Sequence, residues 1–152
     1  MRDRDVRNAI QAALIATNVF DVGGVFLWGL PEHYGSGSSN ANVVAIEPVS
    51  SVQRDLWDGS DEDSGLEVTS TVKLTFMARN EDPQLRDEQV ELLFDTAADA
   101  LNGQSLAGFT APPFTKFASW NWQSPAHPER RIVSTFTYKY IVEGWDNYDI
   151  TP

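Results

Sequence analysis

Apolar and polar residues alternate along one long segment near the middle of the chain. From Leu66 to Ala78 every even-numbered position but one is apolar. The apolar positions are Leu66, Val68, Val72, Leu74, Phe76 and Ala78, and the polar positions beside them are Glu67, Thr69, Thr71, Lys73, Thr75 and Arg79. A period of two residues predicts a half-buried β-strand, in this case one of more than ordinary length.

Two other segments have the spacing of amphipathic helices. The first, Arg4–Ala16, repeats apolar residues every three or four positions. The second begins at Asp82 and Pro83, because aspartate accepts from the free amides of a first turn and proline needs no donor there. Gly103 is expected to close it in a left-handed conformation. The expected core faces are Val6, Ile10, Ala13 and Leu14 in the first helix, and Val90, Leu93, Ala97 and Leu101 in the second.

Further strands are expected on both sides of the long one. After a short apolar segment, Val25–Leu30, the stretch Val43–Val49 predicts a strand that is stopped by Pro48. Phe114–Trp122 and Ile132–Val142 predict a hairpin, since two prolines in the connecting SPAHPERR are excluded from central strands. The expected fold class is therefore α+β, with a mainly antiparallel sheet packed against two helices in a single domain.

Three segments are expected to lie outside these elements. A loop at about 35–42 is rich in Gly, Ser and Asn, and a second loop at about 55–65 is acidic, so we expect both to be flexible. Residues 144–152 form a C-terminal arm that carries Trp145, Tyr148 and Ile150. Such an arm packs either on its own subunit or on the next one, and we favour the next one.

Composition narrows the class of protein. A chain of 152 residues corresponds to about one domain, 1–152, and the absence of cysteine excludes disulfides and thiolate metal sites. The first residues are too charged for a signal peptide, and no apolar run approaches the length of a membrane helix, so a soluble, intracellular protein without a membrane partner is expected. The formal net charge of -11 opposes extensive binding to the phosphates of nucleic acid. It either keeps the protein soluble or provides a surface over which DNA slides.

Candidate chemistry is sparse, so no catalytic, cofactor or metal site is expected. His33 and His127, the two histidines, lie in proline-containing loops and are interpreted as exposed loop residues. Asp61, Asp63 and Glu67 superficially suggest a calcium loop, but Gly65 falls one place early and Thr71 replaces the bidentate glutamate. No nucleophile elbow or phosphate-binding glycine pattern is present.

Trp120 and Trp122 are two residues apart and are expected to share one face of a strand. They could stack on a base or a sugar. Because few cations are nearby in the sequence, packing or a partner interface is the favoured interpretation.

The order of elements from Asp82 onward resembles the tail terminator or tail completion proteins of long-tailed bacteriophages. The resemblance is carried by the helix LLFDTAADALNGQSL, the strand FTKFASWNW and the strand RRIVSTFTYKYIVEGW, and the opening helix VRNAIQAALIA is also similar. Together these segments cover about two-thirds of the chain. The resemblance lies in the order and type of the expected elements, and the segments contain no invariant sequence motif.

The resemblance implies a virion structural protein, made in the host cytoplasm, that forms a ring at the head-proximal end of the tail tube. Such rings are usually hexamers, end tube polymerisation, join the head–tail connector protein and let DNA pass. The implied partners are other copies of the chain, the tail tube protein, the connector protein and DNA without sequence-specific binding. The family has no catalytic residues, and no cofactor is implied.

These considerations single out two sets of residues. The expected interface residues are Trp145, Tyr148, Ile150, Trp120 and Trp122. The expected lining of the DNA path is an acidic loop with Asp58, Asp61, Glu62 and Asp63. Two alternatives stay open: another connector or tail tube protein, and a small α+β pocket enzyme or ligand-binding protein in which Tyr138, Tyr140 and a buried acid line a cavity.

Overall fold

A computed structural model describes residues 3–31, 40–55, 65–101, 114–123, 125 and 127–143, with the side chains of 55, 114–119 and 141–143 left undescribed. Its elements in chain order are α1 (Asp3–Ala16), β1 (Val25–Phe26), β2 (Ala41–Asp55), β3 (Gly65–Arg79), α2 (Pro83–Leu101), β4 (Phe114–Gln123) and β5 (Glu129–Glu143).

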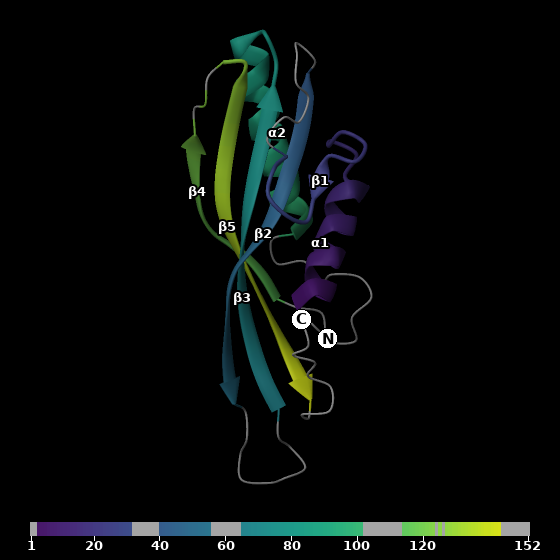
Figure 1. Ribbon diagram of the computed structural model, residues 1–152, viewed down its shortest axis with the longest axis vertical. Coiled ribbons are helices and arrows are strands. Elements are labelled where there is room, and N and C mark those ends of the chain that lie inside the picture. The colour runs from purple at the N-terminus through teal and green to yellow at the C-terminus, as the bar shows by residue number, and fades with distance from the viewer. Residues whose placement is uncertain are drawn as a thin grey trace.

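The strands form one five-stranded sheet in the order β1-β2-β3-β5-β4. All neighbouring pairs are antiparallel except β1 and β2, which are parallel. The α+β class expected from the sequence is therefore confirmed, with one parallel pair added. Figure 1 shows a long, strongly twisted sheet, and the strand ends of β2, β3 and β5 project well beyond both helices.

The alternation along β3 places its even-numbered residues against the helices. All six apolar positions predicted to face the core are buried, and the exception in the pattern, Ser70, is buried as well. The register pairs Val72 with Phe136, so the even-numbered residues of β5 face the same side. We call this side the helix face and the opposite side the outer face. The helix face carries the main core, which includes Phe76, Phe136 and Tyr138.

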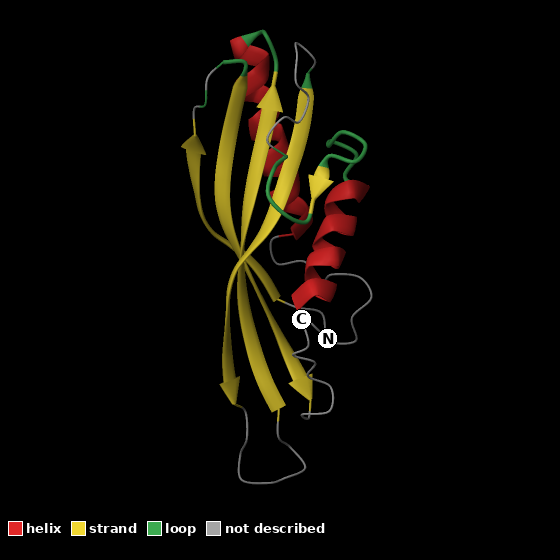
Figure 2. Cartoon of the chain, in the orientation of Figure 1, coloured by secondary structure: helices red, strands yellow, loops and turns green. Residues whose placement is uncertain are grey.

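The first helix starts one residue before its predicted start and ends at Ala16 as predicted, and α2 begins at Pro83 as predicted. Ala13 of the predicted core face is only partly buried. Val6, Ile10 and Leu14 of α1 are fully buried, as are Val90, Leu93, Ala97 and Leu101 of α2. The backbone amides of Gln84 and Leu85 donate to Asp82 Oδ1 at 2.9 Å and 3.4 Å, which confirms the predicted cap. The predicted closing residue Gly103 lies outside the described residues. Figure 2 shows the two helices beside the sheet.

A second, smaller apolar cluster covers part of the outer face. After β1 the chain crosses this face, and Phe26 and Leu30 pack against Ala41, Val43 and Met77. This cover explains why β3 is buried on both faces over its last residues, where simple alternation ends. The short apolar segment Val25–Leu30 therefore contributes a two-residue strand and a lid over one end of the sheet.

The prediction that Pro48 stops the strand is wrong, because β2 continues to Asp55. The pairing register of β2 with β3 shifts between Pro48 and Ser50, and β1 pairs only with Val44 and Ala45 of β2. Beyond Ala45 the strand is therefore an edge strand, where a missing amide donor is tolerated. Ala41, where β2 begins, falls within the range 35–42 in which a loop was expected, and residues 32–39 lie outside the described residues.

Candidate functional site: sheet edges, an anchored helix and the outer face

The sheet has two edges that lie at opposite ends of its strand order. One edge is β4. The other is β2 beyond Ala45, because β1 covers only two of its residues. Edge strands present backbone groups that another chain can pair with, so both edges are candidate assembly surfaces.

Trp120 and Trp122 lie on the β4 edge, opposite Ser134 and Ile132 of β5. This register confirms that the two tryptophans share one strand face, which is the helix face. Each also has a neighbour on its own subunit: the Trp120 ring lies 5.5 Å from the ring of Phe94 in α2, and the Arg130 guanidinium lies 5.9 Å from the Trp122 ring. They nevertheless stay 57% and 44% exposed. This combination of partial support and large exposed aromatic area is typical of interface residues.

The β2 edge also exposes apolar side chains. Val49 and Val52 are 57% and 66% exposed, and both lie in the part of β2 that β1 does not cover. Isolated exposed valines are ordinary on a protein surface. Their place on an open strand edge is what makes them candidates for contact with another chain.

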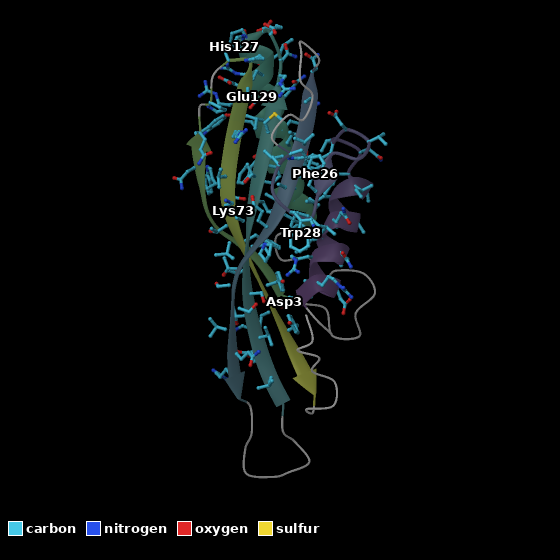
Figure 3. All side chains as sticks on the ribbon, viewed as in Figure 1. Asp3, Phe26, Trp28, Lys73, His127 and Glu129 are labelled. Atoms are coloured by element: carbon cyan, nitrogen blue, oxygen red, sulfur yellow. The ribbon has the colours of Figure 1, made fainter. Side chains whose placement is uncertain are left out.

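A hydrogen-bonded cluster anchors the first turn of α1 to the helix face. Asp3 Oδ1 accepts from Ser70 Oγ at 2.7 Å and from the Tyr140 hydroxyl at 2.5 Å. Ser51 Oγ donates to Asp3 Oδ2 and lies 2.9 Å from Ser70 Oγ. The cluster thus joins α1 to β2, β3 and β5, and Figure 3 shows Asp3 near the middle of the molecule.

Tyr138 lies beside this cluster and its hydroxyl is 3.5 Å from the backbone oxygen of Asp3. Burial raises the pKa of Tyr138 to about 12, and the negative charge of Asp3 acts in the same direction. The phenol therefore stays protonated at neutral pH, where it is a hydrogen-bond donor and a poor general base. The acid beside the two tyrosines is Asp3, which is only partly buried and accepts hydrogen bonds from both hydroxyls.

A network of charges occupies the end of the sheet where Figure 3 labels His127 and Glu129. Asp87 accepts from Arg86 at 2.9 Å and from Arg130 at 3.0 Å. The hydrogen bond from Arg86 holds the pKa of the Asp87 carboxyl below its ordinary value despite the opposing effect of burial, and Arg130 acts in the same direction as Arg86. The network ties α2 to the start of β5.

His127 belongs to this network. Arg86 Nη1 donates to its Nδ1 at 2.8 Å, and its Nε2 lies 3.7 Å from Glu81. The ring is therefore held between a cation and an acid. Within the described part of the chain no three His, Asp or Glu side chains are grouped so that they could hold a metal ion.

The outer face concentrates positive charge in a chain that is acidic as a whole. Among the described side chains, its cations are Arg54, Lys73, Arg79, Arg131 and Lys139, and its acids are Glu47, Glu67 and Glu129. Every one of these cations lies within 4.0 Å of one of the glutamates. Five cations thus share three carboxylates, so this face has a surplus of positive charge.

A cavity of about 510 Å³ opens on the outer face below the segment that follows β1. Lys73, Thr75, Gln123 and Arg131 supply hydrogen-bond donors to its lining. Leu30, Pro31 and Val133 form an apolar wall, and Glu47 is the acid that lines it. A second hollow, of about 360 Å³, lies beside the end of α1 and includes Ile15, Val22 and Asp21.

Several residues expected to act lie outside the described residues. These are Asp58, Asp61, Glu62, Asp63, Trp145, Tyr148 and Ile150. His33, which was interpreted as an exposed loop residue, also lies outside them. Glu67, the described member of the calcium-like pattern, lies on the outer face near Arg54 at 4.0 Å and Lys139 at 3.7 Å. Sequence reasoning missed Asp3, Lys73 and Arg131. An acid in a helical first turn was a signal for Asp3, but no local signal marks the two cations.

Comparison with known proteins is informative at the level of fold. No protein-family model and no curated protein matches the chain. Among solved structures, it is similar to a chain in the virion of a native gene transfer agent (GTA) particle, with a TM-score of 0.46, 17% identity, and coverage of 88% of this chain and 94% of that one.

A second similar chain belongs to the sheath/tube terminator of an extracellular contractile injection system, PVC, in its extended state. The TM-score is 0.52 at 19% identity, and the likeness covers 100% of this chain and 60% of that one. The chain therefore spans less than two-thirds of the length of that protein. This likeness confirms the fold that the resemblance to tail terminators implies. Neither described helix is long and apolar enough to cross a membrane.

Proposed function

We propose that the chain is a structural protein of a phage-like tail, located in the virion. In this proposal it forms a ring, of six copies, on the head-proximal end of the tail tube. The ring ends tube polymerisation and provides the surface that the head–tail connector protein joins, and DNA passes through it. The observation that carries the proposal is the fold shared with a chain of a sheath/tube terminator.

The geometry of the sheet supports association with further copies. Its two open edges, β4 and β2 beyond Ala45, lie at opposite ends of the strand order. A contact between unlike edges is heterologous, and heterologous contacts generate rings when the rotation closes. Trp120 and Trp122 supply large exposed area on one of these edges. We include both tryptophans, together with Trp145, Tyr148 and Ile150 of the C-terminal arm, in the proposed interface.

Charge supports a conduit for DNA. With a formal net charge of -11, the chain repels phosphates overall. We propose that the acidic loop with Asp58, Asp61, Glu62 and Asp63 faces the DNA path. A surface with the same sign of charge as DNA lets the DNA slide past without binding.

A catalytic role has less support. Tyr138, Tyr140 and Asp3 are engaged with one another, and the raised pKa of Tyr138 opposes a role as a base. The tyrosines line neither the outer-face cavity nor the hollow beside α1.

The test is to incubate assembled tail tubes with gold-labelled protein and to image them by negative-stain electron microscopy. The proposal predicts label at one end of each tube and no further growth at that end. Label along the tube, or incorporation into longer tubes, indicates the tube-subunit alternative instead. Absence of label from tubes contradicts a role at the tail tube.

A further inference from the structure

The outer-face cavity combines two kinds of surface that the function proposed above leaves unused. Its floor carries Lys73 and Arg131, and its wall carries Leu30, Pro31 and Val133. The Arg131 Nε is buried, and no described residue accepts its hydrogen. Arg131 Nη2 lies 3.3 Å from Glu129 and Lys73 Nζ lies 3.7 Å from Glu47. A ligand that suits the cavity therefore presents an anionic hydrogen-bond acceptor to these shared cations, next to an apolar group.

We propose that this cavity binds the C-terminal arm, residues 144–152, of a second copy of the chain, with Asp146 and Asp149 pairing with Lys73 and Arg131. The inference rests on the proposed function, because it describes a contact between ring subunits. It places the arm on a defined surface of the next subunit.

The chemistry of the arm matches the cavity. Trp145, Tyr148 and Ile150 alternate with Asp146 and Asp149 over a few residues. In an extended segment Asp146 shares one side with Tyr148 and Ile150, and Asp149 shares the opposite side with Trp145. Each side of the arm therefore presents an acid next to an apolar side chain. Arginine favours carboxylates because its planar guanidinium donates two parallel hydrogen bonds.

The length of the arm requires that it come from another copy. Arg131 lies twelve residues before the end of β5 at Glu143, which is about 40 Å along an antiparallel strand. Asp149 is six residues beyond Glu143 and can extend at most about 22 Å from it. Even with both side chains outstretched, the arm cannot bring Asp149 to Arg131 of its own subunit.

Other occupants fit less well. Nucleic acid is disfavoured because Glu47, Glu67 and Glu129 are interspersed among the cations of the outer face. The hollow beside α1 suits the arm less, because its lining includes Asp21 and no lysine or arginine, whereas Glu47 of the outer-face cavity is accompanied by Lys73 and Arg131. The cavity is thus the described hollow whose charge complements the arm.

The first test measures binding of a fluorescein-labelled peptide of residues 144–152 to the full chain by fluorescence polarisation at low salt. Lys73→Gln combined with Arg131→Gln should weaken binding by about tenfold. Lys139→Gln is the matched control, because Lys73 and Lys139 each lie 3.7 Å from a glutamate and are 44% and 50% exposed. It should change binding by less than about twofold.

A peptide with Asp146→Asn and Asp149→Asn should bind as weakly as wild-type peptide binds the altered cavity. Thermal unfolding followed by circular dichroism checks that each variant is folded. If the double variant does not fold, Lys73→Gln alone is compared with Lys139→Gln. Equal peptide affinity for these two lysine variants would overturn the proposal.

The second test exchanges charges between subunits. One full-length variant carries Lys73→Glu and Arg131→Glu, and the other carries Asp146→Lys and Asp149→Lys. Neither should form rings alone, whereas an equimolar mixture should, because each altered cavity then meets an altered arm in the neighbour. Under conditions in which the wild type forms rings, a mixture that stays dissociated, or variants that each assemble like the wild type, would overturn the arm contact.

The two tests separate this inference from the proposed function. Peptide binding that depends on Lys73 and Arg131 supports the cavity even if no ring is found on tubes or in solution. Rings that form without any such peptide binding support the function and overturn the cavity inference. A short DNA duplex that binds in place of the peptide, and is lost with Lys73→Gln and Arg131→Gln, would identify a phosphate site and also overturn it.

Discussion

Ser70 donates a hydrogen bond to the carboxylate of Asp3 over 2.7 Å, and it is the one polar residue on the otherwise apolar helix face of β3 between Leu66 and Ala78. The interruption in the alternating pattern thus marks the point where α1 is fixed to the sheet. Ser70 is buried, so its hydroxyl depends on a partner within the protein.

Removing the Asp3 carboxylate should therefore destabilise the fold. Asp3→Ala leaves the hydroxyls of Ser70 and Tyr140 without this acceptor, and we expect a loss of about 2 kcal/mol in the free energy of unfolding. Asp5→Ala removes an exposed acid from the same first turn and should cost about 0.5 kcal/mol through the helix dipole. Urea unfolding measures both. Equal losses would show that the hydrogen bonds of Asp3 add nothing beyond its charge.

Tyr138 should make stability fall at alkaline pH. Its pKa is raised from 10.0 to about 12 in the folded chain, so the unfolded chain loses this proton first. The raised pKa contributes about 2 to 3 kcal/mol to the free energy of unfolding below pH 10, and this contribution is lost as the pH rises toward 12. Unfolding measured between these pH values should show a shallower decline for Tyr138→Phe than for the wild type. Identical declines would contradict the raised pKa.

The tryptophans of the β4 edge should matter for assembly more than for folding. Trp120→Ala combined with Trp122→Ala should weaken subunit association by about 2 kcal/mol or more, because large aromatic anchors dominate interfaces. Leu92→Ala is the control, since Leu92 is 56% exposed and lies on α2, outside both sheet edges. Sedimentation velocity reports the ring population. Loss of rings in both variants would remove the specific assignment to β4.

The acidic loop should control how DNA behaves in the ring. Changing Asp58, Asp61 and Asp63 to Asn and Glu62 to Gln should leave assembly intact and create DNA retention at low salt. The control makes the same change in net charge on the exposed side of α2, with Glu88→Gln, Glu91→Gln, Asp95→Asn and Asp99→Asn. Filter binding measures retention. Equal retention by the two variants would show that DNA retention depends on net charge and not on the position of the loop.

Much of the fold was predictable because its signals are local. The alternation of β3 and the aspartate–proline start of α2 each depend on residues a few positions apart. The position of Pro48 within β2 is not predictable in this way, because a proline is tolerated in an edge strand and sequence neighbours do not reveal which strands are edges.

The candidate surfaces were less predictable because they depend on strand register. Asp3 meets Ser70 and Tyr140 only after two strands and a helix are aligned. Lys73 and Arg131 come together on the outer face because β3 and β5 pair in one particular register. The shared face of Trp120 and Trp122 was predictable, since it follows from their two-residue spacing.

The most direct test of the account is the mass of the purified protein by light scattering across concentration and salt, with and without tail tubes, followed by negative-stain imaging. The account predicts a closed ring with a central hole and a mass of about six times the 16.9 kDa chain. Moderate salt should favour it, because copies of an acidic chain repel one another at low salt. A monomer under all these conditions, including the presence of tubes, would contradict the account.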